Sequence, residues 1–353
     1  MATKNRTRTV LALAAVAIAI LVLGAAAKEL PAQLPDPDGK PAAIDKPVKV
    51  FILMGQSNVL GYGHVGPETK KGTLEYYVKK ENKYPYLLDE KGGWKARKDV
   101  WCVQVTSGNH KGWLQPGFGD RRNFIGIELG FGFIVGDALD EEVLIIKTAV
   151  GNRALGWDIM PPSSRTISPE EHVNKWYQGY QLDAYIKDVR GVLNNIKKYY
   201  PSYKGQGYEV AGFTWWQGHK DQSTPGHVLK PPYNISYPDT YEKNLVNLIN
   251  DLRKEFKAPK APFVLATIAF GGNKLAGGGL TVANAQLAVS GEKGKYPEFK
   301  GNVKTIEARG YWRQASESPS SAGHHYNYNA GTYMDVGVDL GRAMAELLTG
   351  KKK

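Results

Sequence analysis

The stretch VFILMGQSN, residues 50–58, determines more of the expected fold than any other part of the chain. It begins with an apolar run containing β-branched and aromatic residues, which is typical of a strand buried on both faces of a sheet. Gly55 permits a tight turn directly after this run, and three polar residues follow. The stretch therefore predicts a buried strand that delivers Ser57 to the carboxyl edge of a parallel sheet, where ligands bind in open α/β folds.

A serine in this position has two interpretations. Its side chain could cap the helix that follows, which is the structural interpretation and the one that a four-residue motif alone favours. It could also be a nucleophile, because acyl transfer needs an exposed hydroxyl on a fixed backbone with N–H donors nearby. The choice between the two depends on what the rest of the chain supplies.

Strand and helix signals alternate along the chain. Apolar strands are expected at residues 48–54, 143–148, 208–215, 263–269 and 303–306, and helices at residues 125–139, 182–200, 241–256, 282–289 and 329–348. Residues 94–105 mix aromatic and charged side chains and are expected to be irregular. Because the strands are continuously apolar, we expect one α/β domain, a flavodoxin-like three-layer α/β/α sandwich with a central parallel sheet. Long insertions at residues 62–123 and 222–237 are expected to shape a binding site.

The N-terminus carries the signature of a secretory signal peptide. Three basic residues precede an apolar stretch, residues 10–27, which ends in three alanines suited to cleavage. An uncleaved anchor is the alternative, because about 18 apolar residues can just span a bilayer. We expect residues 1–27 to be the signal peptide, residues 28–46 a linker rich in Pro, Ala and Asp, and residues 47–350 the folded domain. The mature chain would then be periplasmic or secreted in a bacterium, without membrane insertion.

Charge and cysteine usage exclude several classes of protein. The formal net charge of +12 is spread along the chain, and its one basic cluster is the tail, residues 351–353. With no nucleic-acid motif in addition, we expect no nucleic-acid partner. Cys102 is the single cysteine, so no internal disulfide can form. No His or Cys spacing is typical of a metal site, and we expect neither a metal nor another cofactor.

Three further segments carry small or polar residues where a site could form. They are residues 150–152 (VGN), residues 213–221 (FTWWQGHKD) and residues 323–327 (GHHYN). Taken singly, each has a structural interpretation, such as a strand terminator, a loop amide or a helix cap. Together with Ser57 they supply the parts that acyl transfer needs, namely a nucleophile, a histidine base and N–H or amide donors for the oxyanion.

These blocks resemble those of the sialate O-acetylesterase domain family, carbohydrate esterase family 6 in the SGNH hydrolase superfamily. The similar segments are GQSN at residues 55–58, KTAVG at residues 147–151, WWQG at residues 215–218 and HYN at residues 325–327. They occur in the family's order and cover roughly residues 48–345. The literal string SGNH at residues 107–110 is not this signature, because the superfamily name refers to residues that are scattered over four blocks.

The resemblance implies an SGNH-type serine esterase that removes O-acetyl groups from a carbohydrate. It implies Ser57 as the nucleophile and His325 as the base. It also implies that the backbone N–H groups of Ser57 and Gly151 and the side chain of Gln217 hold the oxyanion. Other polar residues of the blocks are expected to contact the substrate: Gln56, Asn58, Asn152 and His219. The partner would be an acetylated glycan or polysaccharide, and both sialic acids and xylan remain open.

The chain departs from the family's pattern at three positions. Many relatives place an Asp three residues before the catalytic histidine, where this chain has Ala322. We take Asp221 as the expected third triad member, with a backbone carbonyl or Glu307 as alternatives. Relatives often have Glu at the position of His219, and many have a second glycine at the position of Asn152. These two changes bear on the choice of substrate.

Two other functions remain open. A catalytically silent glycan-binding protein on the same scaffold would explain Ala322 and the eight Trp and 20 Tyr. A lipid or short-chain esterase of the wider SGNH clan would use the same nucleophile. Release of acetate from acetylated glycans separates the first from the enzyme, and chain-length preference separates the second.

Overall fold

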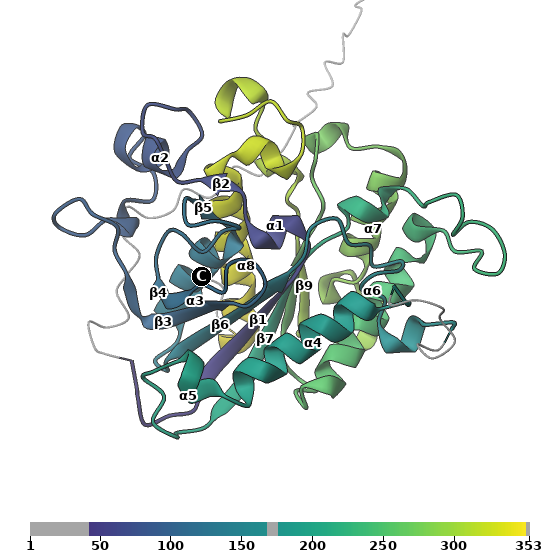
Figure 1. Cartoon of the computed structure of the whole chain (residues 1–353), viewed down its shortest axis with the longest axis horizontal. Coiled ribbons are helices and arrows are strands. Elements are labelled where there is room, and N and C mark those ends of the chain that lie inside the picture. The colour runs from purple at the N-terminus through teal and green to yellow at the C-terminus, as the bar shows by residue number, and fades with distance from the viewer. Residues whose placement is uncertain (1–41, 168–175, 351–353) are drawn as a thin grey trace, which may run out of the picture.

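The computed structural model describes residues 42–167 and 176–350 (Figure 1). The expected signal peptide and most of the expected linker lie outside the described residues. Within the described ranges, no helix combines the length and the apolar character that crossing a membrane requires.

A seven-stranded sheet forms the centre of the fold, in the order β4-β3-β6-β1-β7-β8-β9 (Figure 1). Its strands are β1 (Val48–Gly55), β3 (Arg97–Gln104), β4 (Lys111–Leu114), β6 (Val143–Ala149), β7 (Tyr208–Trp216), β8 (Phe263–Ala266) and β9 (Val303–Ile306). Every neighbouring pair is parallel except the β3–β4 hairpin. β2 (Gly63–His64) and β5 (Phe124–Ile125) form a separate antiparallel pair. The strand β1 therefore lies in the interior of the sheet, as its apolar run predicts.

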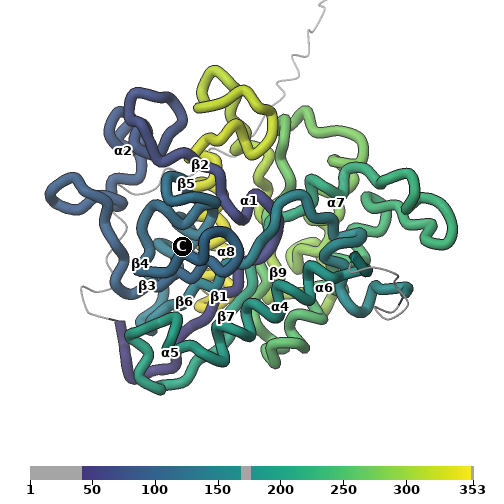
Figure 2. Tube along the Cα trace, viewed as in Figure 1, coloured from purple at the N-terminus to yellow at the C-terminus, as the bar shows by residue number. Residues whose placement is uncertain are grey.

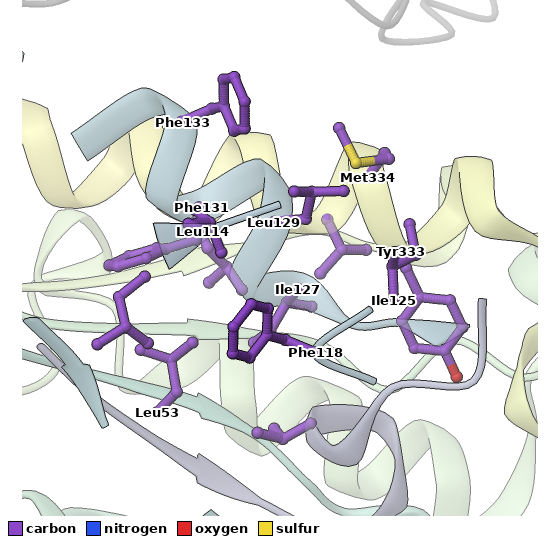
Figure 3. Close-up of a cluster of buried hydrophobic side chains, with 14 of the residues drawn as sticks. Leu53, Leu114, Phe118, Ile125, Ile127, Leu129, Phe131, Phe133, Tyr333 and Met334 are labelled. Atoms are coloured by element: carbon purple, nitrogen blue, oxygen red, sulfur yellow. The ribbon is translucent and has the colours of Figure 1, made fainter. Parts of the chain in front are cut away.

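Helices cover both faces of the sheet (Figures 1 and 2). The helices are α1 (Ser57–Leu60), α2 (Leu74–Lys80), α3 (Ile127–Ala138), α4 (Tyr180–Leu193), α5 (Ile196–Tyr199), α6 (Tyr237–Glu255), α7 (Gly277–Ala288) and α8 (Ala330–Thr349). Phe51 and Leu53 of β1 belong to a hydrophobic core shared with α3 and α8. Figure 3 shows Leu53 in one cluster of buried side chains with Leu129 and Phe131 of α3 and Met334 of α8. Val50 and Ile52 alternate with them and belong to a second core that contains residues of α4, α6 and α7. The three-layer α/β/α architecture is therefore confirmed.

Three expected elements differ from the structure. Residues 94–105 are not irregular as expected, because they contain β3, and the sequence did not indicate its hairpin partner β4. The charged side chains that obscured β3 form ion pairs, because Arg97 contacts Asp99 of the same strand and Asp137 of α3. The expected helix at residues 182–200 is divided into α4 and α5, and the expected strand at residues 263–269 ends at Ala266.

Candidate active site

Ser57 lies directly beyond the carboxyl end of β1 and is the first residue of α1 (Figure 1). The turn before it requires Gly55, because a Cβ atom there would lie 2.4 Å from the backbone oxygen of Trp216 in β7. The hydroxyl of Tyr185, on α4, donates to the Gly55 carbonyl oxygen at 3.0 Å and fixes the strand end. The backbone N–H of a first helical residue has no partner inside its helix. This position therefore presents both a hydroxyl and an N–H group from one residue.

Ser57 lines a pocket of about 350 Å³ at this edge of the sheet. The pocket is formed by segments that are far apart in the sequence. Its lining residues are Gln56, Ser57, Tyr62, Gly151, Asn152, His219, Lys220, Gln222, Phe270, His324 and His325. Six of the residues that the sequence singles out therefore share one pocket. The other three, Asn58, Gln217 and Asp221, are buried and are not among its lining residues.

A larger cavity of about 610 Å³ lies near the start of β7, at the opposite end of the strands. Its lining, drawn from residues 208–211, 256–262, 301–302 and 347–348, contains no serine or histidine among the described residues. We therefore place the candidate active site in the smaller pocket, on the chemistry of its lining and not on its size.

Gly151 lies directly beside Ser57, on the loop that follows β6. A Cβ atom built on Gly151 would be 3.7 Å from the Ser57 Cβ atom. The preceding N–H, of Val150, donates to the Tyr185 hydroxyl at 2.7 Å. None of the described residues accepts a hydrogen bond from the Gly151 N–H. The N–H groups of Ser57 and Gly151 are therefore suited to hold an oxyanion that forms at Ser57.

His325 reaches the pocket from a short 3₁₀ turn, His325–Tyr328, in which its backbone φ is +47°. Its ring stacks on Tyr62, with 4.0 Å between the ring centroids and 8° between the planes. Burial, and then the neighbouring His324, lowers the pKa of His325 to about 4, while Asp120 opposes the shift. The imidazole is therefore neutral near pH 7 and can accept a proton.

The contacts of His325 with Ser57 and with a carboxylate are incomplete. Within the described residues, the Nδ1 atom of His325 is buried without a hydrogen-bond partner. Hydrogen bonds are found instead for the other two histidines of the pocket, between His324 and the Ala322 oxygen and between His219 and Asn58. A bound substrate would have to complete the contact between Ser57 and the base, as is common for catalytic groups in unliganded enzymes.

Asp221, the expected third triad member, is not brought to His325. Its carboxylate accepts hydrogen bonds from the N–H groups of Leu155 (3.0 Å) and Gly156 (2.8 Å) and from the Gln217 amide (2.6 Å). Burial raises the pKa of Asp221 to about 7, and these three donors oppose the shift by favouring the charged form. In this geometry Asp221 ties the loop after β6 to the loop after β7.

Glu307, the alternative carboxylate, is engaged elsewhere as well. It accepts from the Thr267 hydroxyl at 2.9 Å and from the Arg309 guanidinium at 2.6 Å. No carboxylate of the described residues therefore orients His325 by a direct hydrogen bond to Nδ1.

Gln217 does not have the geometry expected of an oxyanion donor. Its side-chain nitrogen donates to the Arg153 carbonyl oxygen (2.8 Å) and to Asp221 (2.6 Å), and its oxygen accepts from the Tyr241 hydroxyl (3.1 Å). A primary amide has two N–H donors, and both are already used. The sequence could not show this, because the acceptors lie 64 and 4 residues away along the chain.

Gln56 and Asn58, on either side of Ser57, connect the end of β1 to the loop after β7 that carries His219. Asn58 is fully buried, and its side-chain nitrogen lies 2.9 Å from the Nδ1 atom of His219. The Gln56 side-chain oxygen accepts from the Gly218 N–H at 3.3 Å. The His219 ring packs on Phe270, with ring centroids 3.5 Å apart. Burial, and then the neighbouring His325, lowers the pKa of His219 to about 3, so this imidazole is also neutral near pH 7.

A buried ion pair beneath the pocket was not recognised from the sequence. Lys147 of β6 is fully buried and lies 2.9 Å from the carboxylate of Glu128 on α3. The Lys147 ammonium also donates to the carbonyl oxygen of Leu60 at the end of α1 (2.9 Å) and to that of Phe118. A lysine inside an otherwise apolar strand was the available signal, since an unpaired lysine is almost never fully buried. The pair fixes the short helix that begins with Ser57.

Two remaining sequence features, the SGNH string and a possible metal site, do not add to the pocket. The SGNH string at residues 107–110 lies in the connection between β3 and β4, and the Ser107 hydroxyl donates to Asp120 at 2.8 Å. Among the described residues, no group of three or more His, Cys, Asp or Glu side chains could hold a metal ion.

The fold and the pocket together define a class of protein. A serine at the carboxyl edge of a parallel sheet, in one pocket with two N–H groups and a neutral imidazole, supplies the groups that a serine hydrolase would need. The family comparison specifies this class further. Residues 47–346 match the family described as carbohydrate esterase, sialic acid-specific acetylesterase, and the chain belongs to that family. The family groups the protein with hydrolases that act on esters of carbohydrates.

Solved structures with a similar fold have low sequence identity to the chain. A protein from Arabidopsis thaliana is 18% identical, with a TM-score of 0.50 over 84% of this chain and 98% of that chain. A carbohydrate acetylesterase from Xanthomonas citri is 13% identical, with a TM-score of 0.49 over 86% of this chain and 57% of that chain. The Arabidopsis structure supports the fold and carries no argument about activity. Comparison with curated proteins gives no significant match.

Proposed function

We propose that the protein is a serine esterase that removes O-acetyl groups from a carbohydrate. The observation that carries the proposal is the convergence of Ser57, Gly151 and His325 in one pocket at the carboxyl edge of the sheet. Family membership supplies the substrate class, because the matched family consists of carbohydrate esterases. We further propose the finer assignment to carbohydrate esterase family 6 and the SGNH superfamily, on the four sequence blocks.

The reaction follows from the chemistry of these groups. His325 takes the proton of the Ser57 hydroxyl while Oγ attacks the carbonyl carbon of the acetyl group. The negative charge that forms on the carbonyl oxygen is held by the N–H groups of Ser57 and Gly151. The intermediate collapses, the sugar oxygen leaves with the proton from His325, and an acetyl-serine remains. Water, deprotonated by the same imidazole, then attacks the acetyl-serine and releases acetate and the free enzyme.

The proposed setting of the reaction comes from the sequence. The N-terminal pattern favours export to the periplasm or the medium, where acetylated glycans are encountered. The matched family's description favours acetylated sialic acids as the sugar, and acetylated xylan is the other candidate. Release of acetate from a panel of acetylated sialic acids, xylans and other polysaccharides tests the proposal. The proposal predicts release from at least one of these glycans at a higher kcat/KM than from long-chain acyl esters.

A second candidate function has its own observation. Because His325 Nδ1 has no hydrogen-bond partner in the described residues, the pocket lacks a direct carboxylate–imidazole contact. A glycan-binding protein without activity would tolerate this arrangement. Binding of an acetylated glycan to the purified protein, without any release of acetate over prolonged incubation, would favour the binding protein over the esterase.

A further inference from the structure

His219 lies in the candidate site, and the sequence predicts for it only a contact with the substrate. It begins the short turn His219–Gln222 after β7 and lines the same pocket as Ser57 and Gly151. It is 9% exposed, and its ring lies against Phe270. One ring nitrogen, Nδ1, pairs with Asn58, whereas Nε2 is buried with no partner among the described residues.

The partner at Nδ1 determines where the proton of His219 lies. With the Asn58 amide placed as it is, its side-chain nitrogen, which carries only donors, lies 2.9 Å from Nδ1, so Nδ1 accepts. A neutral imidazole that accepts at Nδ1 carries its proton at Nε2. The Asn58–His219 contact therefore makes Nε2–H a fixed donor on a residue that lines the same pocket as Ser57.

A buried N–H donor in a pocket needs a hydrogen-bond acceptor, which a bound ligand can supply. A buried donor without a partner is unfavourable, so such a group in a pocket is suited to donate to a ligand. The ligand atom expected beside Ser57 is the acyl oxygen of the ester. The donor that the family pattern leads one to expect, the Gln217 side chain, is not free for that oxygen, because both of its N–H groups are used inside the protein.

We propose that His219, held in its Nε2–H form by Asn58, is a catalytic residue that donates the third hydrogen bond to the oxyanion. His219 touches the reacting oxygen, and Asn58 is the residue that positions it. This role deepens the proposed esterase function and depends on it. It assigns the two neutral histidines of the pocket to opposite tasks, with His325 accepting a proton and His219 keeping one.

The first test measures the tautomer and does not require turnover. The ¹⁵N chemical shifts of the histidine side chains are recorded on the whole protein between pH 5 and 8, and the His219 signals are assigned by their loss in His219→Gln. The proposal predicts a protonated Nε2 and an unprotonated Nδ1 throughout this range. A proton on Nδ1 would overturn it, because the Asn58 amide would then be rotated and Nε2 would be an acceptor.

The second test uses Asn58→Asp to reverse the tautomer. A carboxylate at position 58 accepts from Nδ1–H and so removes the proton from Nε2. If His219 is an oxyanion donor, kcat should fall by about 10²–10³, with KM little changed. If His219 were the base for Ser57, the same change would build an Asp–His pair and kcat would rise or stay the same. That result would contradict the proposal.

The third test replaces the donor itself. His219→Phe should lower kcat by about 10²–10³ at a similar KM, whereas His219→Gln, which retains an N–H donor, should recover part of the loss. His227, an exposed histidine outside the pocket, provides the matched control through His227→Phe. Equal kcat values for His219→Phe and the control would refute the role, provided that both variants melt like the wild type.

If the wild-type protein releases no acetate from any glycan, the proposed function fails, and the tautomer measurement still tests the geometry around His219.

Discussion

At the scale of single residues, the pocket depends on imidazoles that are kept neutral by burial. His325 and His219 both have pKa values well below the ordinary histidine value of about 6.5. The sequence placed both residues at the site. It could not show their protonation, which depends on burial and on Tyr62, Phe270 and Asn58 from other segments of the chain.

The pKa of His325 makes a prediction for the pH dependence of the reaction. A general base works in its neutral form, so activity is lost when the pH falls below the pKa of the base. Because that pKa is lowered to about 4, the acid limb of kcat/KM should lie near pH 4 and well below the ordinary value for histidine. A pH–rate profile between pH 3 and 9 measures this limb. A limb at pH 6.5 or higher would contradict the buried, neutral imidazole.

Asp221→Asn should act mainly on stability. The substitution places an amide N–H₂ group among three N–H donors that now converge on the carboxylate. We expect the free energy of unfolding to fall by about 1–3 kcal/mol, since buried donors lose their acceptor. Denaturant unfolding measures the loss, and kcat should fall far less than the roughly 10⁴-fold expected on removing an orienting triad carboxylate. A 10⁴-fold loss of kcat at unchanged stability would instead restore Asp221 as the residue that orients His325.

At the scale of elements, the short helix α1 is positioned by a buried ion pair at its end and by hydrophobic packing of its side chains. The Lys147–Glu128 pair contacts the end of α1, and Val59 and Leu60 of α1 belong to the core that contains α3 and α8. The position of Ser57 therefore depends on β6 and α3 as well as on its own strand.

Lys147→Met should be strongly destabilising. It leaves the Glu128 carboxylate buried without its cation, and such a change typically costs about 3–5 kcal/mol. Adding Glu128→Leu should recover much of this loss, because no unpaired charge then remains. Urea unfolding of the single and double variants measures both effects. Lys79→Met, which breaks the exposed pair with Glu68, is the control and should change the free energy of unfolding little. Equal losses for Lys147→Met and the control would contradict the role assigned to the buried pair.

Glycines allow α8 to approach α3 closely. A Cβ atom on Gly337 of α8 would lie 2.4 Å from the backbone oxygen of Ile127 in α3. Gly337→Ala should therefore lower the free energy of unfolding by about 1–3 kcal/mol through overpacking. Gly191→Ala in α4 is the matched control, because nothing lies within 4 Å of its added Cβ atom. The control should be neutral or slightly stabilising, since alanine favours a helix by up to about 1 kcal/mol over glycine. A Gly337→Ala variant as stable as this control would show that the helices can separate at no cost.

At the scale of the whole molecule, the interior strands of the sheet could be predicted from the sequence, whereas β3 and β4 at one side of the sheet could not. β1, β6 and most of β7 are buried and read as apolar runs, whereas β4 forms the edge of the sheet with β3 beside it, and both of these strands carry exposed charged residues. The same limit applies to the site. Residues that follow the interior strands, such as Ser57 and Gly151, converge as predicted, because parallel strands end at one edge of the sheet. The roles of Gln217 and Asp221 depend on hydrogen bonds to the loop after β6, which no local pattern reveals.

The most direct test of the proposed esterase is the release of acetate from an acetylated glycan by the wild type and by Ser57→Ala, with the thermal melt of both proteins as the control. Ser57 is the proposed source of the attacking oxygen, and its side chain makes little contribution to the cores. The account predicts that the variant loses kcat by several orders of magnitude, as removal of a serine nucleophile costs about 10⁶ in a well-studied hydrolase, while its melt stays nearly unchanged. Release of acetate by Ser57→Ala at a rate close to that of the wild type would contradict the account.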